Sequence, residues 1–174
     1  MILGGKTIIE EIRTGAIKCD PFDIRMVGPN SIDVRLHRMI KQVIPNHADG
    51  YIDPEQKQNT RILDLVDCGY LVIKPGELWL GCTVEKIGSR YFVPMLEGRS
   101  SIARMGLQVH LTAGFGDVGF IDQWTLEITS VVPIKIYAGM RIAQVYFEEV
   151  SDNSMLYQGR YNGQEGPTES RFSE

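Results

Sequence analysis

Alternating apolar and polar residues dominate this chain and predict a protein built mainly of β-strands. The two-residue period runs through residues 31–36, 70–74, 77–84, 124–131 and 141–147. This period places successive side chains on opposite faces of a strand, so each segment is expected to bury one face. Glycines and prolines separate the segments, a pattern typical of a sandwich, jelly roll or barrel.

Two short segments depart from this alternation and predict helices. Residues 6–14 carry an apolar stripe, with Thr7 and Glu10 spaced as a capping box and Gly15 as the expected end. Residues 98–106 are good helix formers between two glycines and predict a second helix of about two turns. The expected fold is therefore mostly β with short helices.

Length and composition indicate one folded domain. A chain of 174 residues is long enough for one hydrophobic core and too short for two ordinary enzyme domains, so residues 1–174 are expected to form a single domain. The apolar share of 43% and the charged share of 23% argue against disorder and coiled coil. Residues 151–174 lose apolar periodicity and gather glycine, which predicts a C-terminal tail or lid.

Charge and cysteine content narrow the functional class. The net charge of −4 provides no basic footprint for nucleic acid, whereas a small phosphorylated ligand is compatible with it. We expect neither a membrane span nor secretion, because the chain has no long apolar run and no basic flank before an apolar stretch at its start. Its three cysteines include no Cys-x-x-Cys pair, which fits a cytoplasmic protein with reduced thiols.

The glycine-bracketed helix is a candidate anion site. Ser100 and Arg104 are one helical turn apart and share a face, and Arg99 and Ser101 stand at the amino end of the helix. Unpaired backbone N–H groups and the helix dipole favour anions there. The alternative is a short surface helix with exposed arginines, and this motif alone does not decide between the two.

Two carboxylates are candidates for chemistry. Glu127 alternates with Leu126 and Ile128, so it points away from the core, in a strand that otherwise lacks charge. In a partly desolvated pocket it would suit a general acid or base; on an edge strand it would be an ordinary solvated residue. Asp117 lies in a glycine-rich turn, where it either holds a sugar hydroxyl or a water, or serves the turn alone. His110 has no metal-ligand partner at a usual spacing and is expected to be structural.

The tail carries Tyr157, Arg160 and Gln164 among glycines, a composition that suits a lid over a charged ligand. A disordered terminus is the alternative. The chain lacks the motifs of several enzyme classes: it has no phosphate-binding GxxxxGK[ST] loop, no nucleophilic GxSxG elbow and no Pro-Cys-x-x-Cys zinc pattern. Any deamination is therefore expected to run without zinc.

Taken in order, these segments resemble the dCTP deaminase branch of the dUTPase superfamily. The matching pieces are PNSIDVRL at 29–36, EGRSSIARMGL at 97–107, TAGFGDVGF at 112–120, TLEI at 125–128, GMRIAQ at 139–144 and YQGRY at 157–161. Together they span nearly the whole chain. The resemblance implies a distorted jelly-roll, dUTPase-like β-barrel, a homotrimer with active sites between subunits, and a nucleoside triphosphate substrate that brings Mg²⁺ with it.

The resemblance also implies roles for individual residues. Glu127 would be the general acid or base that activates the water attacking C4 of cytosine, with Ser100 and Arg104 assisting it. Asp117 would contact the 3′-hydroxyl region of the deoxyribose. The implied substrate-binding residues are Arg99, Ser101, Ala113, Asp117, Gln144, Tyr157, Arg160 and Gln164. No residue is expected to bind the metal directly, and dTTP is a candidate inhibitor.

Two details favour members of this branch that convert dCTP to dUMP in one site. These are residues 112–115 (TAGF) and residues 141–144 (RIAQ). The alternatives are an enzyme that only splits dUTP and a nucleotide-binding regulator without catalysis. Gly116 and Val118 replace the isoleucine and proline usual in the family, which predicts a looser turn around Asp117. Residues 37–62 contain no interpretable motif.

Overall fold

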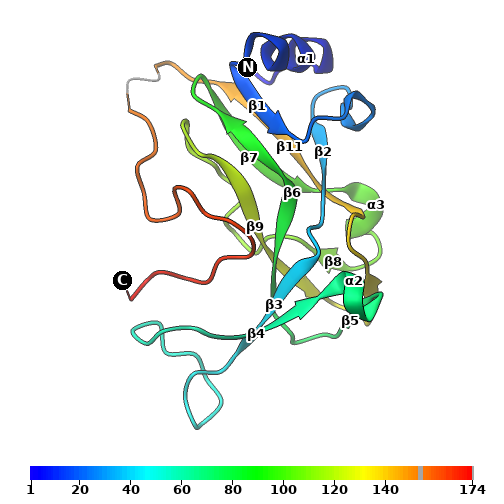
Figure 1. The fold of residues 1–174 in the computed structure, drawn as a ribbon, viewed down its shortest axis with the longest axis vertical. Coiled ribbons are helices and arrows are strands. Elements are labelled where there is room, and N and C mark those ends of the chain that lie inside the picture. Colours follow the sequence, from blue (N-terminus) through cyan, green and yellow to red (C-terminus); the bar gives the residue numbers. More distant parts are fainter. Residues whose placement is uncertain (153–154, 174) are drawn as a thin grey trace.

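The computed structural model describes residues 1–152 and 155–173, and it confirms a mostly β fold with few, short helices. Figure 1 traces the chain from helix α1 at the amino end to the tail at the carboxyl end. The strands are β1 (Ile17–Asp20), β2 (Ile32–Arg35), β3 (Met39–Ile44), β4 (Asn59–Asp64), β5 (Leu71–Ile73), β6 (Trp79–Ser89), β7 (Phe92–Gly98), β8 (Leu107–Gln108), β9 (Ile121–Ser130), β10 (Ile134–Ile136) and β11 (Arg141–Glu149). The helices are α1 (Gly5–Thr14), α2 (Leu65–Cys68) and α3 (Ser100–Ala103), with a 3₁₀ turn η1 (Ile24–Met26).

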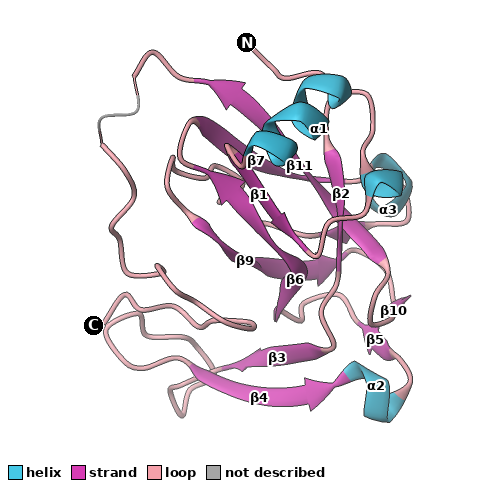
Figure 2. Ribbon diagram, turned by 45° about the horizontal axis from the view of Figure 1, so that its top comes forward, coloured by secondary structure: helices cyan, strands magenta, loops and turns pink. Residues whose placement is uncertain are grey.

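The strands form two larger antiparallel sheets that share one core. A six-stranded sheet has the order β4-β3-β6-β9-β8, with β1 also paired to β6, and a three-stranded sheet has the order β2-β11-β7. The small pair β10-β5 completes the fold (Figure 2). Fully buried residues from both larger sheets, such as Val34, Leu126, Ile128, Val145 and Phe147, belong to a single hydrophobic cluster. One core therefore holds the strands that carry the candidate site.

The predicted strands are present, but several are longer than the alternation indicates. β6 continues to Ser89, beyond the predicted end at residue 84. The alternation ends early because a register shift between Cys82 and Lys86 interrupts the two-residue period. The irregular stretch is held from within: the Thr83 hydroxyl donates to the Glu85 carbonyl at 2.6 Å. A bulge of this kind hides a strand from pattern analysis without ending it.

Two local predictions are wrong. Helix α1 begins at Gly5 with Gly4 as N-cap, so Thr7 lies inside the helix and forms no capping box. The chain turns early because Gly5 packs on the backbone of Gly28, where a Cβ would lie 2.2 Å from the carbonyl oxygen. Helix α3 is one turn rather than about two, because Gly98 belongs to β7 and the chain after Gly106 pairs as β8. Among the described residues, no helix has the length and apolar character needed to cross a membrane.

Candidate active site

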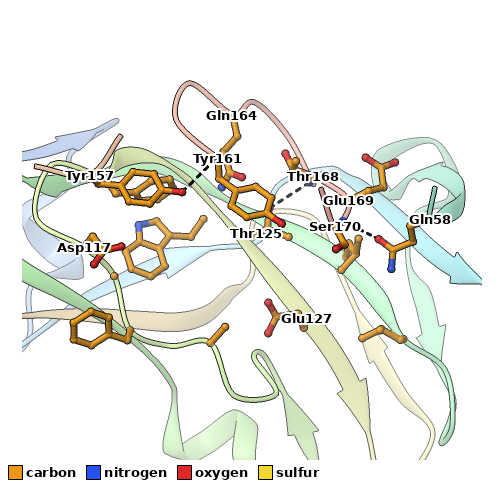
Figure 3. Close-up of a pocket in the computed structure, with 17 residues that line it drawn as sticks. Gln58, Asp117, Thr125, Glu127, Tyr157, Tyr161, Gln164, Thr168, Glu169 and Ser170 are labelled. Atoms are coloured by element: carbon orange, nitrogen blue, oxygen red, sulfur yellow. Dashed lines mark hydrogen bonds between the residues drawn. The ribbon is translucent and has the colours of Figure 1, made fainter. Parts of the chain in front are cut away.

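A cavity of about 430 Å³ opens between β9, the loop of residues 111–120 and the C-terminal tail. Figure 3 shows Glu127 below the tail, with Asp117 and Tyr157 toward one end of the cavity and Gln58 and Ser170 toward the other. The lining residues are Gln58, Leu78, Leu80, Ala113, Phe115, Gly116, Asp117, Phe120, Trp124, Thr125, Glu127, Tyr157, Tyr161, Gln164, Thr168, Glu169 and Ser170. Five of the predicted site residues therefore meet in one place: Ala113, Asp117, Glu127, Tyr157 and Gln164.

Strand β9 aims Glu127 into this cavity. Its neighbours Leu126 and Ile128 are fully buried in the core, so the pleat turns Glu127 to the opposite face, as predicted. At Glu127 the strand pairs with Leu80 of β6, whereas β8 pairs with β9 only at Thr129 and Ser130. Among the described residues, the one hydrogen bond to this carboxylate comes from the Leu111 backbone N–H, 3.1 Å from Oε2. That bond orients the carboxylate and leaves its other oxygen for a ligand or a water.

The turn that carries Asp117 is anchored to two strands. The Gly116 N–H donates to the Pro94 carbonyl at 3.0 Å on the β7 side, and the Gly119 N–H donates to the Ser89 carbonyl at 2.7 Å at the end of β6. The neighbouring Val118 side chain is only 8% exposed. The glycine and valine substitutions therefore do not produce the looser turn expected from the sequence, because backbone hydrogen bonds and burial hold the segment.

The C-terminal tail runs along β9. Gln164 is buried and its Nε2 donates to the Gln123 carbonyl at 2.6 Å, while the Gly166 N–H donates to Gln123 Oε1 at 2.8 Å. Further on, the Thr168 N–H donates to Thr125 Oγ1 at 3.2 Å. Residues 155–173 thus lie against the strand that carries Glu127, and their side chains form one wall of the cavity (Figure 3).

The hairpin formed by β3 and β4 secures the end of this tail, although its sequence contains no interpretable motif. The Glu169 carboxylate contacts Lys41 Nζ at 2.8 Å and accepts a hydrogen bond from the Thr60 hydroxyl at 2.8 Å. The Ser170 N–H donates to Gln58 Oε1 at 2.9 Å. Sequence reasoning missed Gln58, Glu169 and Ser170, since nothing local marks residues that meet across more than one hundred positions of chain.

Replacing Glu169 by Gln is expected to loosen the tail. Burial alone would raise the pKa of Glu169, but the hydrogen bonds from Lys41 and Thr60 outweigh it and hold the pKa below its ordinary value. Losing the charge weakens these contacts, so trypsin should cleave after Arg160 about five times faster at pH 7.5. Glu165→Gln is the matched control, since its ion pair with Lys86 lies at the surface.

The same contact predicts a pH dependence. A carboxylate whose pKa is lowered by folding stabilises the folded state above its unfolded pKa of about 4.3, and this stabilisation disappears as the pH falls through the lowered value. Amide hydrogen exchange of the tail, compared between wild type and Glu169→Gln at the same pH, should differ at pH 7 and converge in acid. Equal exchange at pH 7 would contradict the role of this contact.

The remaining predicted residues lie elsewhere. Helix α3, with exposed Ser100 and Ser101, is on the opposite side of the molecule from the tail in both ribbon views (Figures 1 and 2). Arg104 is exposed at the end of this helix, and Arg99 Nε forms an ion pair with Asp33 at 3.0 Å. None of these four residues of the α3 segment lines the cavity.

Gln144 and Arg160 are engaged by their own surroundings. Gln144 accepts a hydrogen bond from the Ser31 hydroxyl at 2.8 Å and donates to the Gly98 carbonyl at 3.1 Å, so it ties β11 to the chain just before α3. Arg160 Nη1 donates to the Arg171 carbonyl at 2.8 Å within the tail. Neither residue lines the cavity. His110 lies beside Glu97, with 3.6 Å between Nε2 and Oε2, and outside the cavity lining.

The charge of the cavity wall limits what it can bind alone. Its described lining includes three carboxylates, Asp117, Glu127 and Glu169, and no lysine or arginine. A polyphosphate needs cationic or N–H donors to offset its charge. The cavity therefore suits the uncharged part of a nucleotide, and the phosphates need groups from outside this lining. Within residues 1–152 and 155–173, no three His, Cys, Asp or Glu side chains gather as a metal-binding group.

Comparison with known proteins agrees with this architecture. A family model described as dCTP deaminase-like matches residues 2–150. A protein named "dCTP deaminase, dUMP-forming" from Clostridium beijerinckii is 40% identical over 167 residues, covering 95% of this chain and 93% of the relative. A protein of the same name from Tropheryma whipplei is 40% identical over 181 residues, covering 98% of this chain and 92% of the relative.

A solved structure is similar as well. The 2′-deoxycytidine 5′-triphosphate deaminase from Agrobacterium tumefaciens superposes with a TM-score of 0.67 at 19% identity, over 86% of this chain. This chain spans about half of that longer protein, 48% of its length, and the likeness supports the shared fold. The sequence matches extend over nearly the full length of this chain and of its relatives. The chain therefore belongs to the dCTP deaminase-like family.

Proposed function

We propose that this protein converts dCTP and two waters to dUMP, ammonia and pyrophosphate. The observation that carries the proposal is Glu127, a carboxylate aimed from β9 into a cavity of nucleoside size. The relatives named "dCTP deaminase, dUMP-forming" support the same reaction.

In the deamination step Glu127 acts as general base and then as general acid. It takes a proton from a water as the oxygen bonds to C4 of cytosine and passes that proton to N3 of the ring. It then takes the remaining proton from the C4 hydroxyl and passes it to the amine, so that the C4–N bond breaks, ammonia leaves and C4 keeps the oxygen as a carbonyl. The hydrogen bond from the Leu111 N–H holds the carboxylate in place during both transfers. Ser100 and Arg104 assist by holding the water and the carboxylate.

Because Ser100 and Arg104 lie away from the cavity of their own chain, a second copy is proposed to supply them. In a homotrimer, α3 of one subunit would close the cavity of its neighbour and bring Arg99, Ser101 and Arg104 to the triphosphate. The lack of lysine and arginine in the described lining supports this arrangement. Exposed apolar residues beside α3, Met105, Val131 and Val132, offer a surface for such contacts.

In the second step a water attacks the α-phosphorus and pyrophosphate leaves. Asp117, next to the sugar, would orient that water. Mg²⁺ would arrive with the triphosphate and offset the charge of the leaving pyrophosphate. The lining fits this role, since Mg²⁺ prefers oxygen ligands and phosphate oxygens can supply most of them. In this arrangement Tyr157, Arg160 and Gln164 of the tail close over the substrate.

Anion-exchange analysis of dCTP incubated with the protein and Mg²⁺ tests the reaction. The expected products are dUMP and pyrophosphate, with no accumulation of dUTP. Accumulation of dUTP would show that the protein deaminates dCTP but does not release pyrophosphate. Cleavage of dUTP with dCTP intact would indicate a dUTPase alone, and intact dCTP and dUTP a nucleotide-binding regulator.

Mixing two inactive variants tests the shared site. Glu127→Gln and Arg104→Ala are each expected to lose activity, because one lacks the base and the other its assisting cation. When the two are co-expressed, about a quarter of interface sites would contain both wild-type residues by random assortment, so activity should return. No recovery in mixed trimers, separated by tags on the two chains, would place both residues in one subunit's site.

A further inference from the structure

The backbone of Gly116 packs directly against the Trp124 ring. A Cβ atom at residue 116 would lie 2.3 Å from Cη2 and 2.8 Å from Cζ2 of the Trp124 ring. The Pro94 carbonyl oxygen of β7 would lie 2.7 Å from the same Cβ. Atoms cannot approach this closely, so the indole and the β7 backbone together require a glycine in the turn before Asp117.

The indole is fixed at its other end. Trp124 Nε1 donates to the Ile87 carbonyl of β6 at 2.9 Å, and the residue is only 6% exposed. Its ring meets Phe120 edge to face, with centroids 5.4 Å apart, and Phe120 meets Tyr157 of the tail in the same way at 5.7 Å. Aromatic contacts therefore join β9, the Asp117 turn and the tail, and the Trp124 hydrogen bond ties them to β6.

All these aromatic residues line the cavity at the end where Asp117 lies. The wall they form offers apolar surface, while Asp117 offers the hydrogen-bond acceptor. A 2-deoxyribose presents matching chemistry, with an apolar C2′ and a hydroxyl at C3′. A 2′-hydroxyl pressed against this wall would lose its water without gaining a partner, which disfavours a ribonucleotide.

We propose that Trp124 is a specificity-determining residue for the sugar: it forms the wall against the 2-deoxyribose and, through Gly116, sets the position of Asp117. This inference rests on the proposed function and adds to it a residue that discriminates the substrate class. The assignment predicts that selectivity for dCTP over CTP depends on the indole and on the absence of a side chain at 116.

The variants Trp124→Leu and Trp124→Phe test the wall, with kcat/KM measured separately for dCTP and CTP. Trp124→Leu is expected to lower kcat/KM for dCTP about tenfold or more, mainly through KM, and to reduce the dCTP to CTP ratio by a similar factor. Trp124→Phe keeps an aromatic wall but loses the Nε1 hydrogen bond, and it should lie between wild type and Trp124→Leu.

Trp79→Leu is the matched control. This second tryptophan is 2% exposed, donates its Nε1 hydrogen to Glu77 at 3.0 Å and does not line the cavity. It should destabilise the fold as Trp124→Leu does, yet leave the dCTP to CTP ratio unchanged. An unchanged ratio in Trp124→Phe or in folded Trp124→Leu would overturn the proposal, and so would a loss of ratio in Trp79→Leu equal to that in Trp124→Leu.

A double-mutant cycle tests the pairing. Gly116→Ala should lower stability in the presence of Trp124. In the Trp124→Leu background the same change should cost less, because the contact with the indole is gone and only the contact with the Pro94 carbonyl oxygen at 2.7 Å remains. Additive losses would overturn the pairing. This cycle needs no turnover, so it remains decisive if wild-type protein leaves dCTP intact, a result that would count against the proposed function itself.

Discussion

Glu127→Gln is expected to lower the rate of dCTP deamination by about a thousandfold, within the range that general acid–base groups contribute. Glutamine has nearly the same shape and can still accept the hydrogen bond that the Leu111 N–H now gives to Oε2 at 3.1 Å. It cannot take a proton from water at neutral pH. The variant should therefore fold and bind nucleotide as wild type does, and lose the chemical step alone.

The measurement is ammonia release from dCTP at saturating substrate, with dUTP cleavage followed in parallel. Pyrophosphate release from dUTP should fall no more than a few fold, because Asp117 rather than Glu127 serves that step. Glu97→Gln is the control, since this exposed carboxylate on β7 lies outside the cavity lining. A rate loss below tenfold on dCTP, or an equal rate loss on dCTP and dUTP, would contradict the role of Glu127 as the acid–base group of deamination.

The position of Glu127 could be predicted because one short rule governs it. From Trp124 to Ser130 buried and half-buried residues alternate strictly, and buried Leu126 and Ile128 fix the face on which Glu127 must lie. The same rule fails in β6, where the register shift after Cys82 breaks the alternation, and the predicted strand stops at residue 84. Local periodicity thus predicts side-chain direction only where the ladder of hydrogen bonds is regular.

Contacts between segments far apart in the chain could not be predicted, because no local sequence pattern marks them. The composition of the tail predicts a lid, but its anchoring to Lys41 and Gln58 depends on a hairpin that carries no motif. The fit of Trp124 beneath Gly116 is equally invisible, because each residue alone suggests something else: a core aromatic and a loose turn. Such pairs follow from tertiary packing, which the pattern of a single strand does not encode.

The proposed shared site accounts for the division of the predicted residues. The resemblance places Ser100 and Arg104 with Glu127. In one chain, however, α3 lies on the other side of the molecule from the tail (Figure 1), and neither Ser100 nor Arg104 lines the cavity that Glu127 enters. Both statements hold together if one site is built from two subunits. Sequence motifs record which residues act together, and they do not record which copy supplies each residue.

The largest expected effect on stability is at an ion pair whose carboxylate is buried, where Arg35→Met should reduce the free energy of unfolding by about 3–5 kcal/mol. Glu85, in the irregular part of β6, is 2% exposed, and both its oxygens are held by Arg35: the backbone N–H at 2.8 Å and Nε at 2.7 Å. Methionine nearly matches the arginine stem in volume, so the change mainly removes the positive charge and leaves the buried Glu85 carboxylate without its counter-ion.

Urea unfolding at a fixed protein concentration measures the loss, since stability of an oligomer depends on concentration. Arg38→Met is the control: its ion pair with Asp64 lies at the surface, and such pairs contribute about 0–1 kcal/mol. Adding Glu85→Gln to Arg35→Met should recover part of the loss, because a buried amide costs less than an uncompensated charge. A loss under 1 kcal/mol in Arg35→Met would mean that water reaches Glu85 when its partner is gone.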